Sequence, residues 1–344
     1  MIMGEVTDAR LIKAGETLDN LMCTDIASRG IVNHLYKAAR SLSEQPLSYR
    51  FAQELKNRLQ PMDKVFIVTG WIDQPLVSPD HGESDGPAGA VAIARALSVA
   101  CSACPIIIVD ECLVKGMQEV AKAAGFECVP VENLEYAVRF SRLRTVAVLG
   151  FPRGVETGKF YGRKLIEEYK PAACISIERG GVNRAGIIHN MLGMDTGINQ
   201  TFMDDMFNYA TEKSIFTAAI GDGGNEIGMG NILETVKKMV PYGNFCKCGC
   251  NKGIGAAIQV DFLLTAAISN WGAYAVAAML ALLSQNMTAL QDATEERYIL
   301  ESSGRAGFHD AMFGCLGSSV DGCPADSHVA LVTLMRQVVN SLLK

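Results

Sequence analysis

Five glycines, two carboxylates and one amide lie within the ten residues Gly221–Gly230, which read G-D-G-G-N-E-I-G-M-G. Glycines let backbone N–H groups turn toward an anion, and the start of a following helix adds partial positive charge. Asp222 and Glu226 offer the hard oxygen ligands that Mg²⁺, Mn²⁺ or Ca²⁺ prefer. The segment therefore predicts a site for a metal and an anion, and the alternative is a tight turn with solvated acids. The candidates for substrate contacts in this loop are Gly223, Gly224 and Asn225.

A second acidic segment, H-G-E-S-D-G-P at residues 81–87, precedes a predicted helix. Its two carboxylates, Glu83 and Asp85, are two residues apart, so one loop can present both to a metal. Asp85 has an alternative role as the cap of the following helix, because Gly86 and Pro87 suit a helix start. Glu83 has no such role, and we expect it to act as a catalytic acid or base.

Two further predicted strands end in acids, at Asp110-Glu111 and at Glu178-Arg179. We expect Asp110 and Glu111 to be metal ligands, unless one of them caps the next helix. Glu178 is a candidate both for metal binding and for catalysis. Arg179 is a candidate to bind a substrate carboxylate or phosphate, and the alternative for both residues is a structural ion pair. Asn190 is a further candidate for substrate binding.

The sequence has 11 cysteines, and three of them form Cys246-Lys247-Cys248-Gly249-Cys250. One residue between cysteines is fewer than the two to four usual in tetrahedral zinc sites. This spacing favours an exposed, redox-sensitive or adventitious metal loop over structural zinc. Asp321, in S-S-V-D-G, is expected to form a turn, and the alternative is that it is another metal ligand. Isolated histidines with core or surface roles are expected at His34, His309 and His328.

Short apolar runs that end just before these acids predict the scaffold. Strands are expected at 65–69, 106–109, 127–131, 145–149, 174–177 and 216–220, alternating with helices at 88–100, 113–124 and 159–168. This alternation predicts an α/β fold, a three-layer α/β/α sandwich with a mostly parallel sheet. Residues 1–60 are expected to form an N-terminal helical segment packed on an α/β domain of residues 61–344. The acids then share the carboxyl edge of the sheet.

Charge and hydropathy exclude several classes of protein. The net charge is −6 and basic residues form no long run, so nucleic-acid binding is not expected. Residues 262–283 contain no Asp, Glu, Lys or Arg, which permits a membrane span. We favour a buried strand at 260–267, followed by a helix from Trp271 capped by Asn270. The expected protein is cytoplasmic with reduced thiols and does not bind membranes, and both a monomer and a homo-oligomer remain open.

The glycine-rich run at 221–230 resembles the signature of the family related to the C-terminal domain of D-glutamate cyclase. Other segments agree in order: G-E-S-D-G-P at 82–87, I-E-R-G-G at 177–181, N-M-L-G-M-D at 190–195 and S-N-W-G-A-Y at 269–274. The resemblance implies an α/β/α sandwich with an acidic, metal-binding cavity. It also implies a hydro-lyase that closes D-glutamate to 5-oxo-D-proline with loss of water.

The leading hypothesis is a metal-dependent, D-glutamate cyclase-like hydro-lyase that acts on a small acidic metabolite and uses Mg²⁺ or Mn²⁺, with Ca²⁺ as a further option. One alternative is a metal-dependent phosphatase or phosphosugar enzyme, and another is a non-catalytic metabolite-binding protein. The candidate catalytic residues are Glu83, Glu178 and Glu226, and the candidate metal ligands are Asp85, Asp222, Glu226, Glu178, Asp110 and Glu111.

Overall fold

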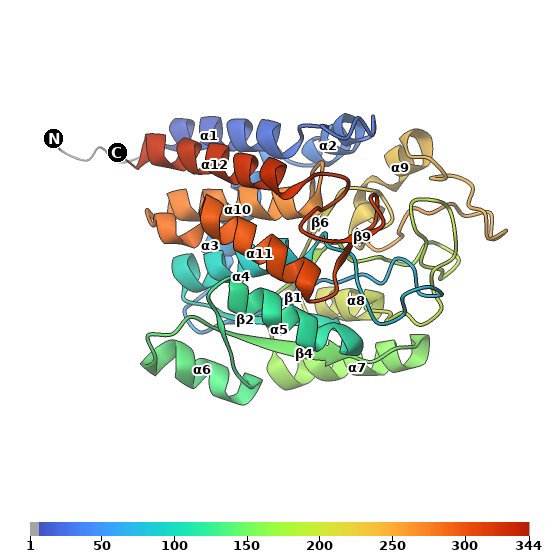
Figure 1. Cartoon of the computed structure of the whole chain (residues 1–344), viewed down its shortest axis with the longest axis horizontal. Coiled ribbons are helices and arrows are strands. Elements are labelled where there is room, and N and C mark those ends of the chain that lie inside the picture. The colour runs from blue at the N-terminus through green and yellow to red at the C-terminus, as the bar shows by residue number, and fades with distance from the viewer. Residues whose placement is uncertain (1–6, 344) are drawn as a thin grey trace.

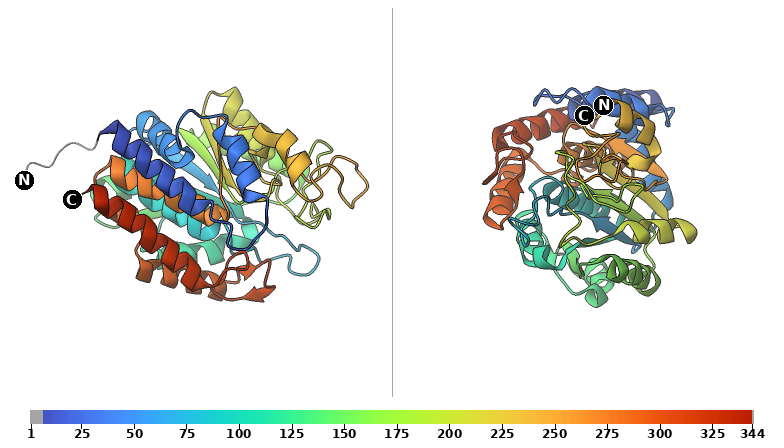
Figure 2. Two further views of the ribbon diagram at one scale, coloured as in Figure 1. Left: turned by 90° about the horizontal axis from the view of Figure 1, so that it is seen from above. Right: turned by 90° about the vertical axis from the view of Figure 1, so that its right-hand side faces the viewer.

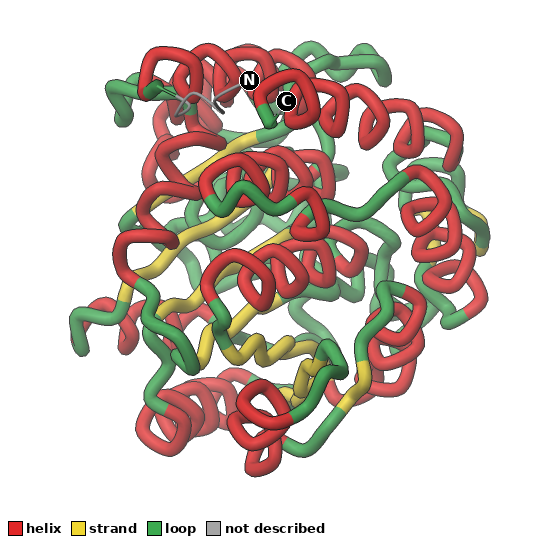
Figure 3. Tube along the Cα trace, turned by 90° about the vertical axis from the view of Figure 1, so that its left-hand side faces the viewer, coloured by secondary structure: helices red, strands yellow, loops and turns green. Residues whose placement is uncertain are grey.

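A computed structural model describes residues 7–343 of the chain. In this part of the protein, seven strands form one sheet in the order β3-β4-β2-β1-β5-β6-β7, and every neighbouring pair is parallel. The strands are β1 (Lys64–Val68), β2 (Cys104–Asp110), β3 (Glu127–Cys128), β4 (Thr145–Phe151), β5 (Ala173–Ile177), β6 (Phe216–Gly221) and β7 (Phe262–Thr265). Figure 3 shows the strands with helices on both sides.

Helices connect these strands and cover the sheet (Figure 1). They are α1 (Asp8–Met22), α2 (Val32–Arg40), α3 (Leu47–Arg58), α4 (Pro87–Cys101), α5 (Val114–Ala123), α6 (Val131–Phe140), α7 (Val155–Tyr169), α8 (Asp204–Glu212), α9 (Leu233–Met239), α10 (Ser269–Leu283), α11 (Ala293–Arg305) and α12 (Ala325–Leu342). Short 3₁₀ helices are η1 (Glu111–Leu113), η2 (Met229–Ile232) and η3 (Met287–Ala289), and β8 (His309–Asp310) and β9 (Cys315–Leu316) form a small hairpin.

The strand order places the helices in two layers. From β1 the chain moves through α4 and α5 toward one edge of the sheet, and from β3 it returns through α6, α7 and α8 toward the other. Right-handed crossovers in opposite directions lie on opposite faces. Helix α10 packs against α4 and joins its layer. The predicted three-layer α/β/α sandwich is therefore confirmed.

The direction of the crossovers reverses between the neighbouring strands β1 and β5. Loops that leave these strands turn toward opposite faces, which opens a crevice at the carboxyl edge of an α/β sheet. The loops gather at this end of the molecule, on the right in Figure 1 and facing the viewer in the right panel of Figure 2. This topology favours ligand binding beside β1 and β5.

The N-terminal helices share the hydrophobic core with the rest of the chain. Helices α1 and α3 pack against α10, and α2 packs against β7 and α9. The rings of Phe51 in α3 and Phe262 in β7 lie 5.3 Å apart, and both Leu18 in α1 and Leu264 in β7 are fully buried. The loop between α1 and α2 thereby reaches the carboxyl edge of the sheet.

The charge-free segment 262–283 forms β7 and then α10. Helices α1, α3, α4 and α12 surround α10, so its sequence is apolar on every side. In the described residues, no helix combines the length and the apolarity needed to span a bilayer.

One expected strand is shorter than predicted. We expected a strand at 127–131, but β3 ends at Cys128 and α6 begins at Val131. Val131, Leu134 and Ala137 are buried, and their spacing of three places them on one helical face. The short apolar run at Val129 and Val131 obscured this period in the sequence.

Candidate functional site

Three carboxylates converge at the carboxyl edge of the sheet, beside β1 and β5. Asp85, Glu178 and Asp222 follow β1, β5 and β6, and each offers an oxygen that lies within 4.8 Å of the oxygens of the other two. Their exposed fractions are 1%, 6% and 3%. We call these three residues the acidic triad. The predicted convergence of acids from separate strand ends is present in the structure for these three.

Asp85 accepts hydrogen bonds from the start of α10. Its Oδ2 accepts from the backbone N–H of Ser269 at 2.8 Å, and its Oδ1 accepts from that of Asn270 at 2.9 Å. The expected capping role is thus present, but on α10 and not on α4. Burial and the neighbouring Asp222 raise the pKa of Asp85 to about 7, although these hydrogen bonds lower it.

Asn270 returns this interaction to α4. We expected Asn270 to cap its own helix, but it lies within α10 and makes no such cap. Its Oδ1 accepts from the backbone N–H of Gly86 at 3.1 Å and of Gly89 at 2.6 Å. Gly86 has φ of 100°, and a Cβ there would lie 2.4 Å from Thr69 Oγ1. Only glycine fits this turn, which brings Asp85 beside α10.

Glu178 follows β5 with a left-handed backbone, φ 45°. Such a conformation in a residue with a long side chain is uncommon and is often found at functional sites. Its Oε2 accepts from Ser269 Oγ at 2.5 Å. Burial first, and then repulsion by Asp222 and Glu226, raise the pKa of Glu178 well above its usual value. Glu178 is thus held in a setting that favours the protonated acid.

Asp222 is paired with Arg29, a residue that the sequence analysis missed. Arg29 Nη1 donates to Asp222 Oδ2 at 2.6 Å and lies 3.5 Å from Asp321 Oδ2. Its side chain is 15% exposed, which makes it a cation at the border of the site. Asp321 lies in a turn, as expected, with φ 50°. It also lies close to Asp222: burial first, and then repulsion by Asp222, raise the pKa of Asp321 well above its usual value.

The side-chain carboxylate of Glu226 binds backbone N–H groups of its own glycine-rich loop. Its Oε1 accepts from the N–H groups of Asp222 at 3.0 Å and Gly223 at 2.6 Å, and its Oε2 accepts from Gly224 at 2.7 Å. Burial and Asp222 raise its pKa to about 7, while the three hydrogen bonds lower it. The loop is an anion nest as expected, and its anion in this structure is the protein's own carboxylate.

Glu83 lies near the triad and is 7% exposed. Burial and then repulsion by Asp73 raise its pKa well above the usual value. Asp73 is itself hydrogen-bonded to His309 at 2.8 Å. Considering residues 7–343, Oε1 of Glu83 is buried without a hydrogen-bond partner. An unpartnered acid of this kind is a good candidate for proton transfer.

The structure places Asp110 and Arg179 in a separate, fully buried ion pair. The Arg179 guanidinium also donates to the carbonyl of Gly70 and to both oxygens of Thr201. Glu111, the first residue of η1, is exposed. The guanidinium of Arg179 is therefore held by protein groups on both of its terminal nitrogens.

The remaining candidates for substrate contacts hold loops together. Asn225 Nδ2 donates to the carbonyl of His189 at 2.7 Å. Asn190 Oδ1 accepts from the N–H groups of Leu192 and Met194, both at 3.1 Å. These contacts fix the loops that carry the two residues.

A surface pocket of about 390 Å³ lies at the opposite edge of the sheet. It is bordered by Phe216 and Phe262, the first residues of β6 and β7, and by Arg50, Glu54 and Arg58 of α3. Because ligands of open α/β sheets bind at the carboxyl edge, this pocket is separate from the acidic triad.

Comparison with known proteins shows the family of this chain. Residues 18–336 match the family model described as D-glutamate cyclase-like, C-terminal. Human mitochondrial D-glutamate cyclase is 29% identical over 271 residues, which cover 77% of this chain and 38% of that protein. The chain thus spans well under half of the length of this relative. The matched residues include the acidic triad and Arg29, and the chain belongs to the D-glutamate cyclase-like, C-terminal family.

Proposed function

We propose that this protein is a metal-dependent hydro-lyase that converts a small acidic amino acid, such as D-glutamate, into its cyclic amide. The observation that carries the proposal is the acidic triad. Its three nearly buried carboxylates follow three different strands and meet where the direction of the crossovers reverses, between β1 and β5. The activity named for the human relative supplies the substrate class. Buried acids with perturbed pKa values that converge at one edge of a sheet are typical of active sites.

The charges of the triad favour a divalent cation. Three carboxylates face one arginine, Arg29, so like charges remain in a buried site. Such repulsion is relieved by binding a cation or by retaining protons. All the offered ligand atoms are carboxylate oxygens, which suits Mg²⁺ or Mn²⁺, with Ca²⁺ as a further option. When bound, the cation would polarise the carboxyl group of the substrate.

Cyclisation joins the amino nitrogen to the side-chain carboxyl carbon and releases one carboxyl oxygen as water. Two of the three ammonium protons end in this water, so proton transfer needs a base and an acid. Glu83, with its unpartnered Oε1, would accept a proton from the nitrogen. Glu178, whose pKa is raised, would donate a proton to the departing oxygen. The exchange occurs twice: each proton that Glu83 gains restores Glu178, so two ammonium protons reach the departing oxygen in turn and both acids end in their starting states.

Arg29 would orient the other carboxylate of the substrate. It borders the triad, and its Nη2 makes only long contacts of 3.5 Å to Asp222 among the described residues, so this nitrogen would donate to the substrate carboxylate. The phosphoryl-transfer alternative has less support, because Glu226 occupies the amides of Asp222, Gly223 and Gly224 that would otherwise cradle a phosphate. The non-catalytic alternative predicts that the acidic metabolite stabilises the folded protein but is not converted to product.

The test is formation of 5-oxo-D-proline from D-glutamate by the purified chain with Mg²⁺ or Mn²⁺, followed by chiral chromatography. Glu178→Gln, which keeps the shape of the side chain but cannot donate the acid proton, should reduce kcat by about 100-fold or more. The matched control is Glu168→Gln, because Glu168 is an exposed residue of α7. Absence of product with the wild-type protein, or an unchanged rate in Glu178→Gln, would refute the proposal.

A further inference from the structure

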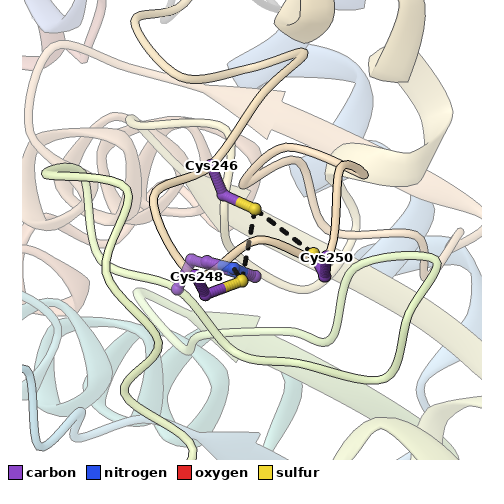
Figure 4. A group of neighbouring side chains, drawn as sticks. Cys246, Cys248 and Cys250 are labelled. Atoms are coloured by element: carbon purple, nitrogen blue, oxygen red, sulfur yellow. Dashed lines mark hydrogen bonds between the residues drawn. The ribbon is translucent and has the colours of Figure 1, made fainter.

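A second group of ligand-type side chains lies away from the acidic triad. Cys246, Cys248 and Cys250 belong to the loop between α9 and β7, and His189 belongs to the loop between β5 and α8. One ligand atom from each of these four residues lies within 4.8 Å of all the others. Figure 4 shows the three cysteine sulfurs turned toward one another.

We propose that His189, Cys246, Cys248 and Cys250 bind one structural zinc ion. Three thiolates and one imidazole in a closed group are a common ligand set of structural zinc. This site is independent of the proposed enzymatic activity, and its soft sulfur ligands separate it from the oxygen ligands of the acidic triad.

The distances fit a single ion better than a disulfide. Cys246 Sγ lies 3.2 Å from Sγ of both Cys248 and Cys250, and Nε2 of His189 lies 3.1 Å from Cys248 Sγ. A disulfide requires about 2.05 Å between sulfurs. Tetrahedral zinc with bonds of about 2.3 Å separates its sulfur ligands by about 3.8 Å. The group needs only a slight expansion to accept the ion.

The surroundings of the group prepare it for a metal. His189 is fully buried, and its Nδ1 lies 3.2 Å from the carbonyl of Ile187. A proton on Nδ1 that is donated to this carbonyl leaves Nε2 as the ligand, which is the usual arrangement of metal-binding histidines. Asn183 Nδ2 donates to Cys250 Sγ at 3.3 Å and to the carbonyl of Gly253 at 2.7 Å. A hydrogen bond to sulfur stabilises a thiolate.

The spacing of one residue between the cysteines favoured an exposed, redox-sensitive or adventitious metal loop over structural zinc. The fold supplies His189 from another loop. The cysteine loop reverses direction at Gly249 and Asn251, which have φ of 83° and 56°. These left-handed residues let side chains two positions apart turn to one side.

A zinc ion here would tie two long loops to the active-site region. The carbonyl of His189 accepts from Asn225 in the glycine-rich loop, and the N–H of Lys247 donates to the carbonyl of Gly193 at 2.8 Å. The four ligands fill a tetrahedral shell and leave no open position, so the role of the ion is structural. Binding would release the thiol protons to solvent.

The test is the metal content and the cobalt spectrum of the full chain, expressed with zinc and purified under reducing conditions. We expect about one zinc per chain that resists brief treatment with EDTA. Replacement by Co²⁺ should produce the intense thiolate-to-cobalt band and the visible bands of tetrahedral coordination. Cys248→Ser should lose at least tenfold in zinc affinity, while Cys315→Ser, at an exposed cysteine outside the group, should not.

The variant Asp222→Asn tests whether the zinc site is independent of the acidic triad. It should retain the thiolate-to-cobalt band in full. Wild-type protein that retains no zinc, contains iron instead, or shows no thiolate band with Co²⁺ would overturn the proposal without needing any variant. Unchanged zinc affinity in Cys248→Ser would also overturn it.

Discussion

Asp85 and Asn270 cap each other's helices. Asp85 accepts from the backbone N–H of Asn270 at the start of α10, and the side chain of Asn270 accepts from Gly86 and Gly89 at the start of α4. Each residue satisfies N–H groups that a helix start leaves without partners. The exchange locks the two helices together and fixes one carboxylate of the acidic triad.

Asn270→Ala should therefore lower the free energy of unfolding by about 1–3 kcal/mol, because the buried N–H of Gly89 loses its acceptor and that of Gly86 keeps Asp85 Oδ1 alone. Urea denaturation measures this loss. The control is Asn286→Ala, which removes an exposed cap of η3 and should cost about 1 kcal/mol or less. Equal losses in the two variants would contradict the importance of the reciprocal cap.

The buried ion pair of Arg179 and Asp110 predicts a loss of stability. Arg179→Met leaves Asp110 charged and unpaired in the interior, so we expect a loss of about 3–5 kcal/mol. Arg297→Met breaks an exposed pair with Asp326 and should cost less than about 1 kcal/mol. Thermal or denaturant unfolding compares the two. A well-folded, stable Arg179→Met protein with a raised KM would instead indicate a substrate contact.

The buried acid Glu296, which lies outside the acidic triad, should make the stability of the protein depend on pH. It is fully buried and accepts from Tyr274 at 2.7 Å and from Gln291 at 3.1 Å. Burial raises its pKa from 4.5 to about 7. Between these values the folded state binds more protons than the unfolded state, so stability falls as the pH rises.

Glu296→Gln should remove this contribution, because the amide stays neutral. Relative to wild type, the variant should gain on the order of 3 kcal/mol between pH 4.5 and pH 8. The side-chain oxygen of Gln291 is buried and unpartnered among the described residues, so it can accept from the new amide. Parallel pH profiles of unfolding free energy for the two proteins would contradict this prediction.

The glycine-rich loop should depend on Glu226. Glu226→Gln keeps the size of the side chain but replaces one acceptor oxygen with an N–H₂ group. This donor would face a backbone N–H donor of the loop, so one hydrogen bond is lost. We expect a loss of about 1–3 kcal/mol in unfolding free energy and slower turnover of D-glutamate. Glu234→Gln, at an exposed acid of α9, is the matched control, and equal effects in both would refute this role of Glu226.

The sequence predicted the parts of the site that depend on local pattern. Strands end where branched apolar runs end, so Asp85, Glu178 and Asp222 could be assigned to one edge of the sheet before their contacts were known. The charge-free segment 262–283 was correctly divided into a strand and a helix. The strand expected at 127–131 ends at Cys128, and the helical spacing of the buried residues Val131, Leu134 and Ala137 marks the start of α6.

Contacts between distant segments could not be predicted in this way. Arg29 stands in an ordinary loop, and only the packing of α1 and α3 on α10 brings it to Asp222. His189 joins the cysteines by the same kind of long-range contact. That Glu226 fills its own loop depends on side-chain direction, which residue spacing does not specify.

The most direct test of the acidic triad as a metal site is calorimetric titration of Mn²⁺ into metal-free protein, for wild type, Asp222→Asn and the exposed control Asp326→Asn. Wild type and the control should bind Mn²⁺ with equal affinity, and Asp222→Asn should bind at least tenfold more weakly, because it loses one of three anionic ligands. No binding to wild type, or equal binding to Asp222→Asn, would show that the three carboxylates do not serve as a metal site.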